Sequence, residues 1–286
     1  IFSKSIWKNK KSLFKILHEL SLQSHFAKIL SEIIKKMIVA NNFKSIIMPY
    51  EAQPFQNKVF LEVKKINKEI RTIGYTAVTQ PFPSMNIFKL GAPDILFVHG
   101  LSEIKHLQNN LLWPAERLKL IPSLKYKKKD KVFLNNKIFI PYSIMKKKIL
   151  IEEFKNLLLR QKNLSLKNFI LQNHPYKYNS LSHKKFVKNL DNIIKNNKNK
   201  FSENAKTNLS IFFGETYAIV EALERGIQVA HICGDPVFES YSERLWDGIK
   251  VSQFSENTFL YTLKKPGQCI NFEEFGEEDT FTKYFN

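Results

Sequence analysis

Two short polar stretches in the second half of the chain carry residue types that bind phosphate groups. One is His174-Pro175 and the other is Gly214-Glu215-Thr216. An imidazole can hydrogen-bond a departing phosphate or protonate it, and a proline can fix the turn that presents the imidazole. A glycine lets a phosphate approach the backbone, and a threonine hydroxyl can cap a following helix or contact the ligand. Together the two stretches predict a phosphate-binding site.

The second stretch lies within residues 207–232, whose pattern predicts one βαβ unit. Apolar runs at 209–213 and 227–232 predict two strands, and the residues from Thr216 to Arg225 predict a helix that stops at Gly226. The free N–H groups and the dipole of such a helix favour an anion at its N-terminus by about 0.3 to 1 kcal/mol. The alternative interpretation is a parallel-sheet crossover that binds no ligand.

The first stretch follows another predicted strand, at 166–172, and precedes a predicted helix at 183–195. The carboxyl ends of parallel strands meet at one edge of a sheet, so His174 and Gly214 can face a single ligand. Glu221, one turn into the next helix, could accept hydrogen bonds from ribose hydroxyls. It could equally be an ordinary surface residue of that helix.

The first half of the chain offers one candidate catalytic carboxylate, Glu51. It follows a predicted strand at 45–48, within the sequence Pro-Tyr-Glu-Ala-Gln-Pro. Ligands of open α/β sheets bind beyond the carboxyl ends of the strands, which is where Glu51 is expected. The alternative role of Glu51 is to cap the helix predicted at 55–67.

Strands and helices alternate along the whole chain, which predicts an α/β protein with two Rossmann-like domains facing a cleft. The elements of the first half continue with strands at 71–78, 94–98 and 117–121 and a helix at 102–112. A charged run at 125–131 predicts a linker, after which the alternation restarts at 137. We therefore expect a first domain at 1–130, with N-terminal helices but too few strands for a complete Rossmann sheet, and a second domain at 131–286.

Composition limits the classes of partner. The 286 residues carry a formal charge of +19, which indicates an anionic partner such as nucleic acid, an anionic membrane surface or a phosphorylated substrate. Lysines dispersed over solvated faces would give the same charge. The lysines are scattered and the aromatic residues fall within apolar runs, so no nucleic-acid partner is expected.

Other sequence features indicate a cytoplasmic protein. The two cysteines are far apart in the sequence and fit a reducing compartment, and no apolar run reaches the roughly 18 residues that span a bilayer. The basic helical segment at 1–40 would suit peripheral contact with an anionic inner membrane face. No metal-binding signature and no P-loop or dinucleotide-binding motif is present in the sequence.

The order of these motifs resembles the donor-sugar domain of GT-B glycosyltransferases. The resemblance rests on the order of five features: a strand, His174-Pro175, a further strand, Gly-x-Thr at 214–216, and a helix with Glu-Ala-Leu at 221–223. The His-Pro pair is similar to that of bacterial sialyltransferases and Kdo transferases, and the Tyr-Glu-Ala-Gln stretch around Glu51 resembles surface-polysaccharide transferases of the same group. The resemblance covers roughly residues 45–250.

The resemblance implies a metal-independent transferase whose donor substrate is a CMP-sugar and which needs no further cofactor. By position it implies phosphate contacts for His174, Pro175, Gly214 and Thr216, and an acceptor-side role for Glu51. The acceptor would be a surface glycan or glycolipid of the capsule, lipopolysaccharide or O-antigen type, and the sugar Kdo or another nonulosonic acid. The alternatives are a transferase or epimerase using a UDP- or GDP-sugar, a basic nucleic-acid-binding α/β protein, and a fragment that binds without catalysing.

Overall fold

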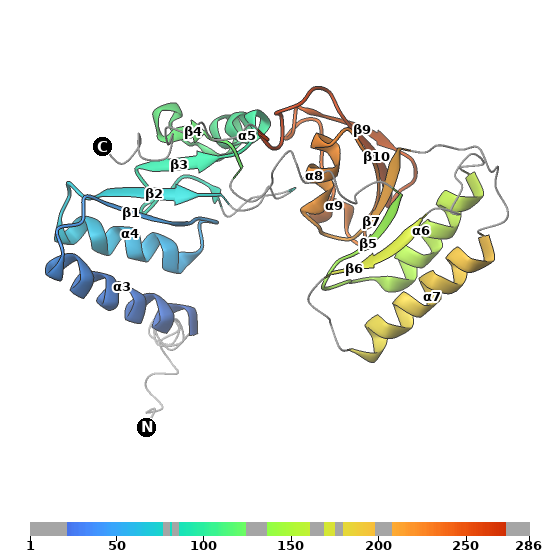
Figure 1. Ribbon diagram of the computed structural model, residues 1–286, viewed down its shortest axis with the longest axis horizontal. Coiled ribbons are helices and arrows are strands. Elements are labelled where there is room, and N and C mark those ends of the chain that lie inside the picture. Colours follow the sequence, from blue (N-terminus) through green and yellow to red (C-terminus); the bar gives the residue numbers. More distant parts are fainter. Residues whose placement is uncertain are drawn as a thin grey trace, which may run out of the picture.

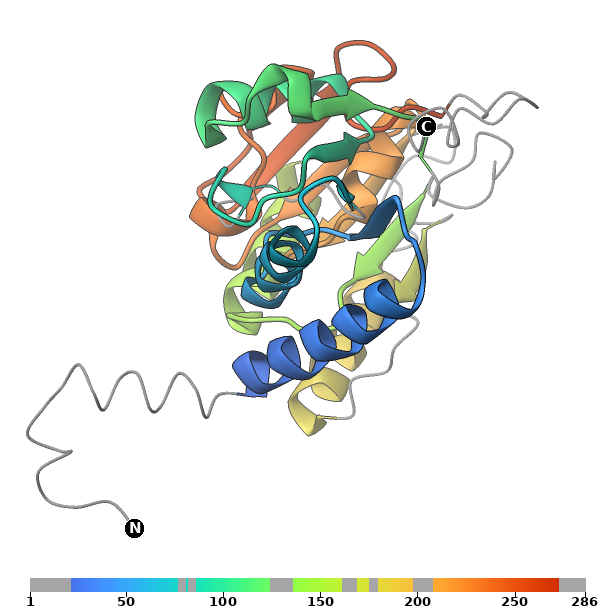
Figure 2. The same cartoon turned by 90° about the vertical axis from the view of Figure 1, so that its left-hand side faces the viewer.

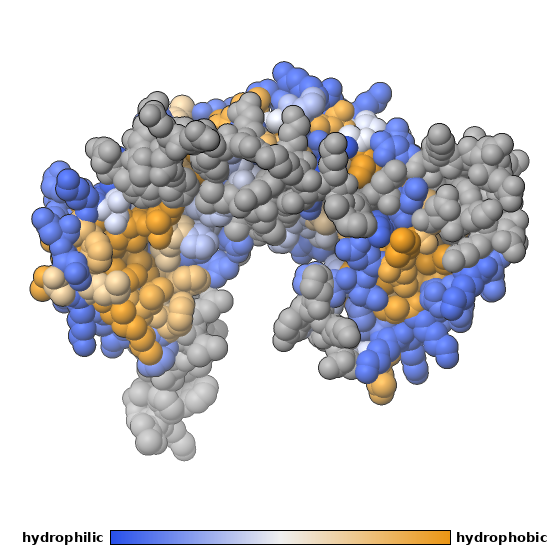
Figure 3. Space-filling model, viewed as in Figure 1, coloured by the Kyte–Doolittle hydropathy of each residue, from blue (hydrophilic) through white to orange (hydrophobic). Residues whose placement is uncertain are grey.

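The computed structural model contains two α/β units that lie side by side (Figure 1). The units are joined along one side, and a notch separates them on the other (Figure 3). The residues that the structure describes are 22–76, 81, 86–123, 136–160, 169–174, 180–197 and 208–272. The linker predicted at 125–131 lies outside these ranges.

The first unit is built on a four-stranded parallel sheet, called sheet A, whose strands follow one another in chain order. Its strands are β1 (Ser45–Pro49), β2 (Arg71–Tyr75), β3 (Ile95–Val98) and β4 (Leu118–Leu120). Its helices are α3 (Leu22–Ala40), α4 (Pro54–Ile66) and α5 (Leu101–Leu111), with a 3-10 turn, η2, at Ala115–Arg117.

Local sequence signals explain the bounds of α4. Pro54 occupies its first turn, where the missing N–H costs nothing, and Lys64 and Lys65 lie in its last turn, where they complement the helix dipole. The helix α3 packs along α4 (Figures 1 and 2). None of the described helices combines the length and apolar character needed to cross a membrane.

The second unit is built on a six-stranded mixed sheet, called sheet B, in the order β6-β5-β7-β8-β10-β9. The four parallel strands are β5 (Lys137–Ile140), β6 (Ile170–Asn173), β7 (Leu209–Phe213) and β8 (Gln228–Ile232). Two antiparallel pairings then add β10 (Thr258–Leu263) and β9 (Ile249–Gln253).

Helices cover both faces of sheet B. The core on one face is formed with α6 (Lys147–Arg160) and α7 (Leu181–Asn197), and the core on the other with α8 (Ala218–Glu224). A one-turn helix, α9 (Pro236–Glu239), follows β8. Because β7 and β8 are buried on both faces, their sequences are continuous apolar runs rather than alternating patterns.

The segment after β10 returns to the first unit and joins the two sheets. The backbone N–H groups of Leu101 and Ser102 donate to the carbonyls of Gly267 (3.2 Å) and Gln268 (2.8 Å), and so occupy donors at the start of α5. The buried carboxylate of Glu224, at the end of α8, accepts from the N–H groups of residues 267, 269 and 270 at 2.8, 2.6 and 3.1 Å. The junction is therefore built largely from backbone hydrogen bonds.

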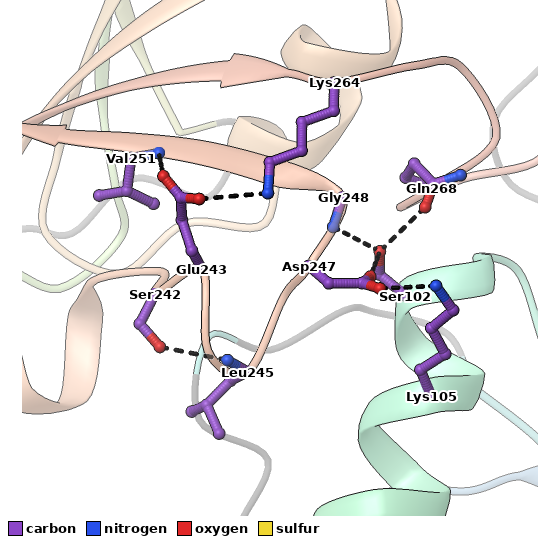
Figure 4. A network of polar contacts seen from close by, with 10 residues as sticks. All are labelled: Ser102, Lys105, Ser242, Glu243, Leu245, Asp247, Gly248, Val251, Lys264 and Gln268. Atoms are coloured by element: carbon purple, nitrogen blue, oxygen red, sulfur yellow. Dashed lines mark hydrogen bonds and ion pairs between the residues drawn. The ribbon is translucent and has the colours of Figure 1, made fainter.

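Side chains add a second set of contacts at this junction (Figure 4). The Ser102 hydroxyl donates to Asp247 (2.8 Å) and accepts from the N–H of Gly248 (3.0 Å), and Lys105 pairs with Asp247 at 2.6 Å. A Cβ on Gly248 would lie 2.3 Å from the Cβ of Gln268, so this close approach requires glycine. The two units are thus packed tightly where they meet.

Candidate functional site

The carboxyl ends of the four parallel strands of sheet B meet at one edge, and His174 lies there. It directly follows β6, and its N–H donates to the carbonyl of Ile140 at the end of β5 (3.0 Å). The residue is exposed, and its ring centroid lies 6.0 Å from that of Tyr142. The imidazole is therefore placed at the ligand edge of the sheet, as predicted. Pro175 lies outside the described residues.

Gly214 ends β7 at the same edge. Its φ of 59° is in the left-handed region, and its N–H donates to the carbonyl of Ile232 at the end of β8 (2.9 Å). A Cβ added there would lie 3.6 Å from Cγ of Pro141, which is ordinary contact. Glycine is therefore favoured at this position by its backbone conformation and not by lack of space.

The strand order places β5 between β6 and β7. The two motifs follow strands that are successive in sequence, but β5, which precedes both of these strands in the chain, lies between them in the sheet. Two strand spacings separate the ends of β6 and β7 by about 10 Å. A ligand that contacts both His174 and Gly214 must therefore span the end of β5.

The helix after Gly214 begins later than predicted. Ala218 is its first residue and Tyr217 its N-cap, so Thr216 precedes the helix rather than starting it. The Thr216 hydroxyl oxygen lies 3.4 Å from the N–H of Ala218, a long hydrogen bond. Glu215 is exposed, and the Tyr217 hydroxyl donates to it at 3.4 Å.

Glu221 is engaged within its own helix. One carboxylate oxygen accepts from Nε and Nη2 of Arg225 at 3.1 and 2.9 Å. Arg225 also lies over the ring of Phe272, with its guanidinium carbon 4.9 Å from the ring centroid. The geometry is that of an i,i+4 ion pair on a half-buried helix face.

A buried histidine that the sequence analysis did not identify holds the Gly214 turn. His231 of β8 is fully buried, and its Nε2 lies 2.7 Å from the carbonyl oxygen of Gly214. That contact requires a proton on Nε2, which leaves Nδ1 to accept from the hydroxyl of Tyr261 at 3.3 Å. Burial lowers the pKa of His231 to about 4, so the ring is neutral at pH 7.

Glu239 is a second residue that the sequence analysis did not identify. It lies at the end of α9, is 6% exposed, and accepts from the N–H of Gly234 at 2.6 Å. A Cβ on Gly214 would lie 4.0 Å from its Oε2, so the carboxyl group faces the same turn. Burial raises the pKa of Glu239, and the charges of Asp235 and Glu215 raise it further.

Three acidic residues near Gly214 determine which ligand groups can bind at this edge of sheet B. Glu215, Asp235 and Glu239 place negative charge beside Gly214, and Lys146 balances part of it through an ion pair with Asp235 (3.3 Å). Carboxyl oxygens accept hydrogen bonds from hydroxyl groups but repel phosphates. The edge near Gly214 therefore suits a ligand that presents hydroxyls there.

Glu51 lies at the carboxyl edge of sheet A, directly after β1 and Tyr50, as predicted. The strands of this sheet point toward the second unit (Figure 1). The carboxylate is half-buried and accepts from the side-chain amide of Gln53 at 3.1 Å. The sequence analysis gave capping of α4 as an alternative role, but Gln56 caps that helix by accepting from the N–H of Gln53 (3.0 Å).

The turn that presents Glu51 is strained and strongly held. Ala52 is fully buried and has a φ of 53°, in the left-handed region that non-glycine residues avoid. Oε1 of Gln56 accepts from the N–H of Glu51 (2.9 Å), and Nε2 donates to the carbonyl of Pro49 (2.8 Å). The side-chain amide of Asn57 donates to the carbonyl of Ala52 at 3.3 Å. Backbone strain of this kind gathers at functional sites.

Within the described ranges, no group of three or more histidine, cysteine, aspartate and glutamate side chains is placed to hold a metal ion. The candidate site therefore consists of two strand edges, one in each unit. The edge of sheet A carries the half-buried Glu51, and the edge of sheet B carries the exposed His174 and Glu215 beside the buried Gly214 and Glu239. The chain matches no protein-family model, no curated protein and no solved structure.

Proposed function

We propose that this chain is a glycosyltransferase that moves a sugar from a CMP-activated donor to a glycan or glycolipid acceptor, with Kdo or another nonulosonic acid as the sugar. The observation that carries the proposal is the placement of His174 and the Gly214 turn on one edge of sheet B. Both are held by backbone hydrogen bonds to neighbouring strand ends. A ligand about 10 Å long, such as a nucleoside monophosphate with its sugar, reaches from one to the other.

In this proposal His174 contacts the phosphate of the donor. Its exposed imidazole can donate a hydrogen bond to the departing CMP and so stabilise the charge that develops on the phosphate. Thr216 offers a hydroxyl at the other end of the ligand, beside the Gly214 turn. No step of this mechanism requires a metal, and a metal-independent reaction remains a prediction.

The ribose contact is assigned to Glu215 in place of Glu221. Arg225 holds the Glu221 carboxylate at 2.9 Å, whereas Glu215 directly follows Gly214 and is exposed. A carboxyl group accepts hydrogen bonds from the two ribose hydroxyls without the repulsion it would exert on a phosphate. This assignment gives the acidic residues at the edge a role in binding the donor.

Glu51 acts from the acceptor side. The rigid turn at Ala52 holds Glu51 at the carboxyl edge of sheet A, whose strands point toward the second unit (Figure 1). There it takes the proton of the attacking acceptor hydroxyl, or attacks the sugar itself if the reaction proceeds through a covalent intermediate. The basic surface then suits an anionic, lipid-linked acceptor at the cytoplasmic face of a membrane.

The test is CMP release from CMP-Kdo in the presence of a lipopolysaccharide-type acceptor. We expect His174→Ala and Glu51→Gln each to lower turnover at least a hundredfold, because each removes a group that acts in the transition state. His25→Ala is the matched control, since His25 is an exposed histidine on α3. Normal turnover by His174→Ala would reject the assignment of His174 to the donor phosphate. Release of UDP or GDP from the corresponding nucleotide-sugars, in place of CMP, would favour a UDP- or GDP-sugar donor.

A further inference from the structure

A groove of about 510 Å³ lies between the first halves of α6 and α7. Its described rim carries four lysines and one carboxylate, Glu152, which pairs with Lys155 at 2.9 Å. The lysines are Lys147, Lys148, Lys155 and Lys185. Three positive charges therefore remain in excess around the groove, so it attracts anions.

The floor of the groove is apolar and its walls carry neutral hydrogen-bonding groups. Phe186 is buried and Ile151 half-buried, and Ser182 and Asn189 add a hydroxyl and an amide. Nζ of Lys147 donates to the Ser182 hydroxyl at 3.0 Å, which ties the start of α6 to the start of α7. A ligand that fits must combine negative charge, hydroxyls and C–H surface, and an acidic sugar has all three.

The groove opens beside the candidate site. Both helices follow parallel strands of sheet B, so their first turns lie at the carboxyl edge that holds His174 and Gly214. Lys146, next to the groove residue Lys147, pairs with Asp235 after β8 at 3.3 Å. The start of the groove and the candidate site therefore lie at the same edge of sheet B.

We propose that this groove is a second binding site, which holds an acidic oligosaccharide chain extending from the candidate site. The choice of a sugar ligand rests on the proposed transferase function, whereas the groove and its charge do not. Lys147, Lys148 and Lys185 bind the carboxylates of successive sugar residues, while the sugar hydroxyls contact Ser182 and Asn189. The site would give the enzyme a preference for acceptors that already carry acidic sugars.

The described groove fits a nucleic acid less well. Proteins that bind single strands stack bases on exposed aromatic rings, and Phe186, the aromatic residue among the described lining, is 3% exposed. The groove thus offers charge and hydrogen bonds but no stacking surface.

The test measures binding of a hexamer of N-acetylneuraminic acid to the full chain by calorimetry at about 0.15 M salt. We expect Lys148→Glu/Lys185→Glu to weaken binding at least tenfold. The matched control is Lys35→Glu/Lys36→Glu, which makes the same change in net charge with exposed lysines of α3, and it should change binding less than twofold. An equal loss in both variants would overturn the proposal, because it would mean that only net charge matters.

Two further ligands test whether the groove recognises the charge and the sugar chemistry of the hexamer. A neutral maltohexaose should not bind, and binding as tight as that of the acidic hexamer would overturn the assignment. A deoxythymidine oligonucleotide that binds more tightly than the acidic hexamer, and loses binding only in the groove variant, would reassign the groove to nucleic acid. CMP binding should be unchanged in the groove variant, so failure of the donor site and failure of the groove are separate results.

Discussion

Two turns at strand ends, one in each unit, carry the candidate residues, and the two turns are stabilised by different contacts. Each has a residue in the left-handed region just beyond a parallel strand, Ala52 after β1 with a φ of 53° and Gly214 after β7 with a φ of 59°. The first turn uses a strained alanine held by side-chain amides. The second uses an unstrained glycine held by a buried histidine.

The difference shows where the rigidity of each turn originates. Around Ala52 the restraints are local, since Gln56 and Asn57 lie in the first turn of the next helix. Around Gly214 the restraint comes from another strand, through His231 and a hydrogen-bonded series that continues to Tyr261 and the N–H of Tyr241 (3.1 Å). The Glu51 turn should therefore respond to changes in its own segment, and the Gly214 turn to changes in β8 and β10.

The largest effect is expected for Gln56→Ala at the first turn. The substitution removes two hydrogen bonds to Oε1 and one from Nε2, and should lower the free energy of unfolding by about 3 kcal/mol. The change in the free energy of unfolding is measured by urea-induced unfolding. Gln53→Ala serves as the comparison, because its half-buried amide donates one hydrogen bond to Glu51 at 3.1 Å, and it should cost less, about 1 kcal/mol. Equal costs would show that the turn is not held by Gln56.

The next effect concerns pH at the second turn. The pKa of His231 is lowered to about 4 in the folded state, while an unfolded histidine titrates near 6.5. As pH falls below 6.5 the unfolded state binds the proton first, so His231 should cost about 2 kcal/mol of stability between pH 7 and pH 5.

His231→Gln keeps a donor for the Gly214 carbonyl and removes this titration. Its free energy of unfolding should therefore fall less between pH 7 and pH 5 than that of the unchanged protein. Parallel profiles for the His231 variant and the unchanged protein would contradict a buried neutral imidazole.

A smaller effect is expected for Gly214→Ala. The added methyl group has room, so the cost is that of an alanine in the left-handed region, about 1 to 2 kcal/mol. Thermal unfolding checks the value. A cost above about 4 kcal/mol would indicate a steric clash that the structure does not contain.

The smallest effect is expected for the reciprocal change, Ala52→Gly. Relief of backbone strain gains about 1 kcal/mol, and loss of a fully buried methyl group costs about 0.8 kcal/mol. The net change in unfolding free energy should lie within about 1 kcal/mol of zero in either direction. A large destabilisation would mean that packing by the methyl group, and not backbone strain, dominates at this turn.

Local sequence patterns predicted the elements well. Apolar runs located β5, β7 and β8 because buried parallel strands need continuous apolar sequence, and Gly226 marked the end of α8 because it adopts a φ of 74°. Glu51, His174 and Gly214 were found because strand ends are recognisable from sequence. They lie at the predicted edges of their sheets.

Non-local features escaped sequence reasoning. The position of β5 between β6 and β7 is a property of strand order, which no single segment encodes. Nothing local distinguishes the buried Glu224 from the ion-paired Glu221 one turn earlier. A lone histidine within the apolar run of β8 was a signal for His231, but its contact with Gly214 depends on the pairing of β7 with β8. The sequence analysis overlooked Glu239 because α9 is a single turn.

The central claim is that the edge of sheet B binds CMP through His174. The most direct test is the thermal unfolding of the full chain titrated with CMP, UDP, GDP and AMP. A ligand at a hundredfold excess over its Kd stabilises the folded state by about 2.7 kcal/mol. The account predicts a shift selective for CMP that is retained in His25→Ala and lost in His174→Ala. A shift that survives in His174→Ala, or no shift with CMP, would contradict it.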